Sequence, residues 1–176
     1  ALNVLVVGGS LGAKAINECV PQALALLSKD MPPNVVHQSG KQHLEPVKAA
    51  YEQAGVAADI KPFLEDMAHY YAWADVVICR AGALTIAELA AAGVASILVP
   101  FPFAVDDHQT GNARFLSERG AAILLPQSEM TPQKLAELLR ELSREHALEM
   151  AQAARVAAQP AAAQKVATVC MELAAA

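Results

Sequence analysis

Charged and aromatic residues are scarce in this chain of 176 residues: Asp, Glu, Lys and Arg make up 18%, and Phe, Trp and Tyr make up 5%. Hydrophobic residues reach 55%, and a composition so poor in charge and so rich in apolar residues excludes an intrinsically disordered protein. Basic residues are not in excess either, because the formal net charge is −5. We therefore expect no nucleic-acid partner and no electrostatic attraction to acidic lipids.

Cysteines are also few, and no hydrophobic run is long. Cys19, Cys79 and Cys170 lie far apart, which is typical of reduced thiols in a cytoplasmic protein. The longest uncharged stretch, residues 89–105, is interrupted by glycine and proline and is too short to span a bilayer as a helix. Metal-binding patterns such as D-x-D and H-E-x-x-H are absent, so no metal cofactor is predicted. The chain enters a predicted strand at Leu2 without an initiating Met, from which we expect a piece of a longer protein.

Short apolar runs alternate with longer helical stretches along the chain. Several runs are continuously apolar, as in strands that helices cover on both faces. This alternation favours right-handed crossovers and predicts an α/β fold, a Rossmann-like doubly wound domain with a parallel sheet of about six strands. The expected strands are residues 2–7, 34–37, 59–62, 75–79, 95–99 and 121–125. The expected helices are residues 13–28, 42–54, 65–73, 84–92, 107–119, 131–142, 144–157 and 161–175.

The last predicted helix is set apart by Pro160. We expect residues 1–158 to form one domain and residues 159–176 to form a separate C-terminal helix. Its apolar positions give a weak amphipathic pattern. Two arrangements are consistent with this pattern: the helix packs on this domain, or it reaches a partner domain.

A glycine-rich turn, G-G-S-L-G over residues 8–12, joins the first predicted strand to the first helix. Glycines let a backbone approach a ligand closely, and the free N–H groups of a helix N-terminus bind anions such as phosphate. The turn lacks the dinucleotide fingerprint G-x-G-x-x-G and the Walker lysine, which argues against NAD and against ATP-type hydrolysis. The alternative is a turn that only links a strand to a helix.

A second turn of this kind follows the fourth predicted strand, where residues 79–88 read C-R-A-G-A-L-T-I-A-E. The first N–H groups of a helix beginning near Ala83 form another anion site. Glu88 is the only charged residue in a long apolar stretch, and its carboxylate needs donors, which ligand hydroxyls can supply. A helix-dipole role for Glu88, or a salt bridge with Arg80, is the alternative.

Two more polar stretches follow predicted strands. After the fifth strand, a proline-stiffened loop leads to His108 and Gln109 in the first turn of a helix, where they are placed to hydrogen-bond a polar ligand. After the third strand, residues 63–67 are placed to flank a base. Capping by Asp106 or Asp107, and core packing and capping at residues 63–67, are the alternatives.

These four stretches share one property: each lies at the carboxyl end of a predicted strand, where open α/β sheets bind ligands. With the usual strand order 3-2-1-4-5-6, the first and fourth strands are neighbours. The two turns then face one ligand, and two helix N-termini neutralise a diphosphate without a metal.

In combination, five motifs resemble the MurG family of bacterial N-acetylglucosaminyltransferases. They are G-G-S-L-G-A at residues 8–13, H-Q-S-G at 37–40, A-W-A-D at 72–75, the run at 80–88 and D-H-Q-T-G-N-A at 107–113. The resemblance covers nearly the whole chain and matches the C-terminal, donor-binding half of a two-domain GT-B glycosyltransferase. It implies transfer of N-acetylglucosamine from UDP-N-acetylglucosamine to lipid I, with inversion at the anomeric carbon, to give lipid II for peptidoglycan.

The resemblance also implies roles for individual residues. Ser10 and the backbone of the first turn would hold the diphosphate, with Thr85 nearby. Phe63 and Leu64 would contact uracil, Leu64 through its backbone, and Glu88 would accept hydrogen bonds from the ribose hydroxyls.

The sugar would be read by the Ala83 backbone, His108 and Gln109. No residue of this chain is expected to be the catalytic base, and the isolated chain is expected to bind the donor without catalysing transfer. The full set of predicted donor-site residues is Gly9, Ser10, Leu11, Gly12, Phe63, Leu64, Arg80, Gly82, Ala83, Leu84, Thr85, Glu88, His108 and Gln109.

By the same resemblance, the N-terminal half of the enzyme would contact lipid I and the membrane, and residues 159–176 would pack on that half. The protein would be peripheral, on the cytoplasmic side of the bacterial inner membrane. Two other functions stay open: a stand-alone donor-binding subunit of a split N-acetylglucosaminyltransferase, and half of a UDP-N-acetylglucosamine 2-epimerase. The helix start at Asp107, His108 and Gln109 favours the transferase over the epimerase.

Overall fold

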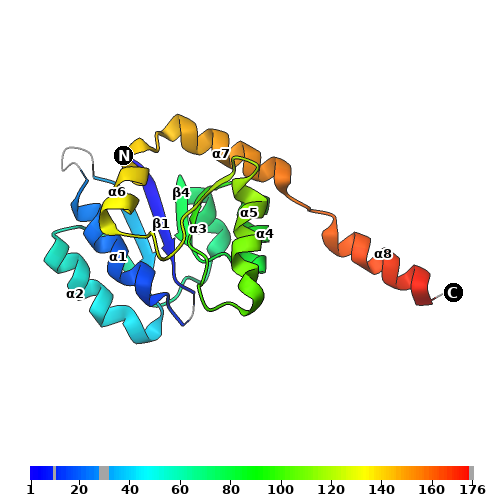
Figure 1. Cartoon of the computed structure of the whole chain (residues 1–176), viewed down its shortest axis with the longest axis horizontal. Helices are drawn as coiled ribbons and strands as arrows, with labels where there is room; N and C mark the ends of the chain where they lie inside the picture. The colour runs from blue at the N-terminus through cyan, green and yellow to red at the C-terminus, as the bar shows by residue number, and fades with distance from the viewer. Residues whose placement is uncertain (10, 28–31, 175–176) are drawn as a thin grey trace.

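A six-stranded parallel sheet forms the centre of the computed structural model, which describes residues 1–9, 11–27 and 32–174 (Figure 1). The order across the sheet is β3-β2-β1-β4-β5-β6, and every neighbouring pair is parallel. The predicted fold and strand order are therefore confirmed. The strands are β1 (Asn3–Val7), β2 (Asn34–Gln38), β3 (Asp59–Lys61), β4 (Val76–Cys79), β5 (Ala95–Leu98) and β6 (Ala122–Leu124).

Helices cover both faces of the sheet, so the strands are buried on both sides. One face packs against α1 (Lys14–Ala25), α2 (Leu44–Ala54) and α6 (Pro132–Glu141). The other packs against α3 (Met67–Trp73), α4 (Ala83–Ala92) and α5 (His108–Ser117), while α7 (Arg144–Ala157) contributes to both cores. Two short 3-10 helices, η1 (Lys41–His43) and η2 (Val105–Asp107), precede α2 and α5.

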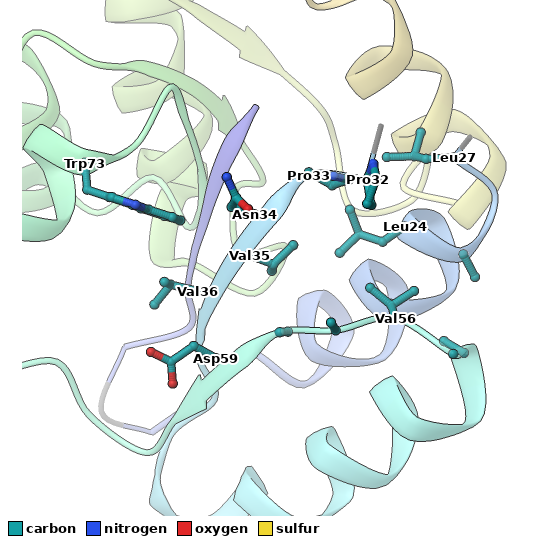
Figure 2. Close-up of a pocket in the computed structure, with 15 residues that line it drawn as sticks. Leu24, Leu27, Pro32, Pro33, Asn34, Val35, Val36, Val56, Asp59 and Trp73 are labelled. Atoms are coloured by element: carbon teal, nitrogen blue, oxygen red, sulfur yellow. The ribbon is translucent and has the colours of Figure 1, made fainter. Parts of the chain in front are cut away.

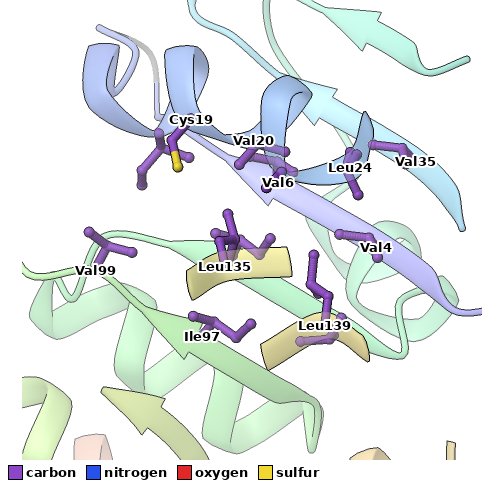
Figure 3. Packing of buried hydrophobic residues seen from close by; sticks show 14 of the residues in the cluster. Val4, Val6, Cys19, Val20, Leu24, Val35, Ile97, Val99, Leu135 and Leu139 are labelled. Carbon is purple, nitrogen blue, oxygen red and sulfur yellow. The ribbon is translucent and has the colours of Figure 1, made fainter. Parts of the chain in front are cut away.

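The period-2 geometry of a strand divides its residues between the two cores. Val4 and Val6 of β1 lie in the core beneath α1 and α6, whereas Leu5 lies in the opposite core. Figure 3 shows the first of these cores, where Leu135 and Leu139 of α6 lie among side chains of β1 and β5 and of α1. A strand buried on both faces has no polar face, which explains the continuously apolar runs in the sequence.

The last helix, α8 (Ala162–Ala174), extends away from the domain, and all of its residues are exposed (Figure 1). The arrangement in which it packs on this domain is therefore wrong. The physical reason is that the other helices already cover both faces of the sheet, and Pro160 separates α8 from α7. Across the described ranges, no helix combines the length and the apolar character needed to cross a membrane.

Candidate functional site

The two glycine turns leave neighbouring strands at the same edge of the sheet. β1 and β4 pair in parallel with Val7 opposite Cys79, so the turns that follow them lie side by side, as predicted. α1 begins after Ala13 and α4 after Gly82, and among the described residues no side chain caps either helix. Side chains cap α3, α6 and α7, whereas within the described residues α2 and α5 also have no side-chain cap. The first N–H groups of α1 and α4 are therefore available to an anion.

A cavity of about 500 Å³ opens at this edge, between the start of α1 and the loops that follow β4, β5 and β6. Three of the predicted site residues line it: Gly12, Arg80 and Gln109. The other lining residues are Ala13, Lys14, Ala15, Glu18, His43, Phe101 and Gln127. Ser10 lies outside the described residues. The predicted residues that do not line this cavity are Gly9, Leu11, Phe63, Leu64, Gly82, Ala83, Leu84, Thr85, Glu88 and His108.

Gln109 joins two loops at the cavity wall. Its Oε1 accepts hydrogen bonds from the backbone N–H groups of Phe101 (2.9 Å) and Ala81 (3.2 Å). These two donors fix the orientation of the amide, because only its oxygen can accept them. The Nε2 group of Gln109, which can only donate, is the part of the amide that remains for a ligand.

Arg80 connects three loops around the cavity. Its Nη1 donates to the carbonyls of Val99 (3.2 Å) and Pro100 (3.1 Å), and its Nη2 donates to Oε1 of Gln127 (2.6 Å). Its guanidinium carbon lies 5.4 Å from the centre of the Phe101 ring, and burial lowers the pKa of the guanidinium. Arg80 therefore holds the frame of the cavity through protein acceptors.

Glu88 has a different partner from the one considered in the sequence. Its Oε2 accepts a hydrogen bond from the Tyr71 hydroxyl (3.0 Å), and Arg80 is committed to the three acceptors above. Within the described ranges Arg80 forms no ion pair, so the alternative of an Arg80–Glu88 salt bridge is wrong. Burial, and then the charge of Glu88, raise the pKa of Tyr71. The hydroxyl therefore remains a donor that orients the carboxylate.

The stretch after β3 has both a buried and an exposed apolar residue. Leu64 is 2% exposed and belongs to the core beneath α3 and α4, so only its backbone can serve a ligand. Phe63 is 51% exposed. Asp66 caps α3 by accepting from the His69 N–H (3.0 Å). Core packing and capping thus account for Leu64 and Asp66, while the Phe63 ring remains accessible.

His108 lies outside the cavity at the start of α5. Its Nδ1–H donates to the Val105 carbonyl (2.7 Å), which leaves its Nε2 free to accept. Asp107 is the N-cap residue of α5, but its Oδ1 accepts from the Thr110 hydroxyl (2.7 Å) and caps no backbone N–H group. Side-chain capping of α5 by Asp106 or Asp107 is therefore wrong. The cause is the left-handed backbone of both residues, with φ of 52° and 51°.

The glycines of the first turn have different physical roles. A Cβ on Gly12 would lie 2.5 Å from the Ser39 carbonyl oxygen and 2.6 Å from the His43 ring. A Cβ on Gly9 would meet no atom within 4 Å. Gly12 is therefore required by the close contact with the turn after β2, and Gly9 is the position where the backbone is open to a ligand.

Comparison with known proteins decides the family. The model of the glycosyltransferase family 28 C-terminal domain matches residues 3–167. The chain belongs to this family.

Individual relatives confirm the resemblance to the MurG family. A UDP-N-acetylglucosamine--N-acetylmuramyl-(pentapeptide) pyrophosphoryl-undecaprenol N-acetylglucosamine transferase of Dechloromonas aromatica (strain RCB) is 62% identical over 99% of this chain and 49% of the relative. The crystal structure of Acinetobacter baumannii MurG matches with a TM-score of 0.92 and 50% identity, over 97% of this chain and 52% of that one. This family 28 domain thus spans about half the length of the curated relatives it matches.

A more distant match shows the fold alone. The UDP-N-acetylglucosamine 2-epimerase from Neisseria meningitidis has a TM-score of 0.63 at 11% identity, over 98% of this chain and 44% of that one. The epimerase alternative therefore rests on shared architecture, whereas the family 28 match extends to the sequence.

A buried chain of polar groups lies behind the first glycine turn of this family 28 domain, and the sequence did not predict it. Asn17 Nδ2 donates to the Ser39 carbonyl (3.0 Å), so its Oδ1 must accept from His37 Nε2–H (2.9 Å). His37 Nδ1 then accepts from the Tyr51 hydroxyl (2.9 Å). This order of donors requires neutral His37, and burial lowers its pKa to about 3. These hydrogen bonds fix the position of the Ser39 carbonyl, against which Gly12 packs.

The low pKa of His37 predicts acid sensitivity of the fold. The unfolded chain takes up the proton near the ordinary histidine pKa of 6.5, but burial lowers the pKa of His37 in the folded chain to about 3, so stability is lost as pH falls between these values. Because of His37, the free energy of unfolding should be about 2 kcal/mol lower at pH 5 than at pH 7. Urea unfolding at both pH values measures it.

His37→Asn is the variant that removes this titration. The variant should be less stable at pH 7, and its loss of stability on going to pH 5 should be smaller by the same amount. His146→Gln, a change at an exposed histidine, serves as the control and should keep the full acid-dependent loss. An unchanged loss in His37→Asn would contradict the assignment.

A larger cavity, of about 860 Å³, lies at the opposite end of the sheet (Figure 2). It is lined by residues at the start of β2 and β3 and at the ends of α1 and α2, with Trp73 and Leu24 on either side of β2. Its lining is mainly apolar and contains none of the predicted site residues. Three predicted site residues, Gly12, Arg80 and Gln109, line the smaller cavity instead.

Proposed function

We propose that this domain is the donor-binding half of an inverting N-acetylglucosaminyltransferase, and that it binds UDP-N-acetylglucosamine at the carboxyl edge of the sheet. The observation that carries the proposal is the pair of uncapped helix N-termini, α1 and α4, on the adjacent strands β1 and β4. Family membership and the names of the relatives support the same ligand. In the complete protein, the sugar is transferred to lipid I, giving lipid II for peptidoglycan.

The chemistry of the leaving group explains the two helix N-termini. When the bond between the sugar and UDP breaks, negative charge grows on the diphosphate. N–H groups that already point at this position stabilise the charge without reorganising, which lowers the barrier. The acceptor hydroxyl must lose its proton to a base, and we assign that base to the other half of the protein.

The parts of the donor take different places along the edge. The diphosphate lies between the turns after β1 and β4, with the uracil against Phe63 and the backbone of Leu64. Glu88 accepts from the ribose hydroxyls through the oxygen that Tyr71 does not occupy. Gln109 donates from Nε2 to an oxygen of the sugar.

We assign the other partners of the whole protein to its other half. Lipid I and the cytoplasmic face of the bacterial inner membrane are contacted by the half of the protein that corresponds to the unmatched part of the relatives. The exposed apolar residues of α8, Val166, Val169, Met171 and Leu173, pack on that half. Proteolysis that cuts α8 equally fast in this chain and in the full-length protein would overturn this packing.

Thermal unfolding with and without ligand tests the proposal. UDP and UDP-N-acetylglucosamine at 100 times their Kd should each stabilise the domain by about 2.7 kcal/mol. For a domain of this size, the melting temperature should rise by about 5–10 °C. ADP is the matched control for a diphosphate without uracil and should stabilise less.

Three outcomes would count against the proposal. An equal shift with ADP and UDP would show that the edge binds diphosphates without reading the base. No shift with millimolar UDP-N-acetylglucosamine would remove donor binding altogether. Formation of an epimer by the full-length protein would favour the epimerase alternative.

A further inference from the structure

The residue between β4 and α4 is held by two amide side chains from one turn of α5. Ala81 is fully buried, and its carbonyl accepts from Asn112 Nδ2 (3.0 Å). Its N–H donates to Gln109 Oε1 (3.2 Å). Gln109 and Asn112 are three residues apart and therefore lie on the same face of α5.

The two side chains differ in how many groups they bind. Gln109 also accepts from the Phe101 N–H and so links two loops, whereas Asn112 has the Ala81 carbonyl as its one hydrogen-bond partner within the described residues. The peptide group between Ala81 and Gly82 is planar, so fixing its carbonyl fixes the direction of the Gly82 N–H. Asn112 thereby sets the backbone plane that leads into α4.

Ala81 is packed in the core, but packing does not hold Gly82. Around Gly82, a Cβ would meet no atom closer than the Thr85 hydroxyl at 3.6 Å, so the site is roomy. Glycine also moves easily between backbone conformations. Gln109 holds the N–H of Ala81, and the hydrogen bond from Asn112 is the restraint on its carbonyl, which keeps the Gly82 N–H in one direction.

We propose that Asn112 is a positioning residue for the diphosphate of the donor: through the Ala81 carbonyl it aims the Gly82 N–H, at the N-terminus of α4, at the ligand. The proposal rests on the proposed function, because it presupposes a diphosphate at this turn. Asn112 acts through the backbone and does not touch the ligand.

The test compares UDP with uridine, which has the same base and ribose but no phosphate. Asn112→Ala should lose about five- to tenfold in affinity for UDP, the equivalent of one hydrogen bond, and keep its affinity for uridine. Titration calorimetry measures UDP binding, and NMR titration measures the weaker uridine. The matched control is Thr110→Val on the same helix, whose hydroxyl bonds to Asp107 and not to Ala81; it should bind both ligands like the wild type.

Each outcome is informative. A loss for UDP alone supports the positioning role, whereas an equal loss for both ligands, or no loss, overturns it. If Asn112→Ala does not fold, Asn112→Ser keeps a small polar side chain that is too short to reach the Ala81 carbonyl, and the same comparison applies. A wild-type chain that binds neither ligand would contradict the proposed function itself.

Discussion

Gly12→Ala is expected to lower the free energy of unfolding by about 3 kcal/mol, which corresponds to a fall of about 6–12 °C in the melting temperature. Two effects add up. The backbone at Gly12 is left-handed, with φ of +76°, and a Cβ would overlap the Ser39 carbonyl at 2.5 Å. Because that carbonyl is held by Asn17, the clash cannot be relieved without disturbing the buried polar chain.

Gly9→Ala is the matched control for this prediction. Gly9 has nearly the same backbone, with φ of +74°, but open space around it. The variant should lose only about 1 kcal/mol, the cost of a left-handed alanine. Chemical denaturation of both variants measures the difference. Equal losses would show that backbone conformation alone, and not the contact with the turn after β2, explains the glycine.

Glu88→Gln is expected to weaken UDP binding by about ten- to hundredfold, the usual worth of hydrogen bonds to a charged group. Gln keeps the shape of Glu, and its oxygen can still accept from Tyr71. Its other terminal group is then an NH2, which cannot accept from ribose hydroxyls, and the charge is lost as well. Glu88 is exposed on α4, so the fold should be unaffected. Calorimetric titration with UDP provides the measurement.

Two controls make this prediction specific. Inorganic pyrophosphate lacks the ribose, and its affinity should be the same in Glu88→Gln and in the wild type. Tyr71→Phe removes the donor that orients the Oε2 of Glu88 and should weaken UDP binding by a smaller factor. If Glu88→Gln binds UDP as well as the wild type does, the ribose assignment is wrong.

Much of the fold could be predicted because burial on both faces leaves a strong pattern in the sequence. Continuous apolar runs gave the six strands, and the usual doubly wound order gave their arrangement. The position of α8 could not be predicted in this way. Its amphipathic pattern indicates that one face is apolar, but a pattern does not say which surface covers that face.

The site was predictable in outline, and its local contacts were not. Strand neighbours at the carboxyl edge brought the two turns together, as expected. The partners of Arg80, however, come from residues 19 to 47 positions away, a separation at which sequence spacing carries no information. A signal for the buried polar chain was present: Asn17 directly follows Ile16 on an apolar stretch of α1, and His37 ends the apolar run of β2.

The protruding α8 carries an exposed cysteine that can be labelled. All three cysteines are free thiols, but Cys19 and Cys79 are buried, and burial raises their pKa to about 11 and about 12. Cys170 is exposed on α8. Because thiolates are the reactive form and buried thiols are inaccessible to reagents, a maleimide dye at neutral pH should attach at Cys170 alone, which would make the unmodified sequence ready for fluorescence measurements of how this helix moves relative to the sheet.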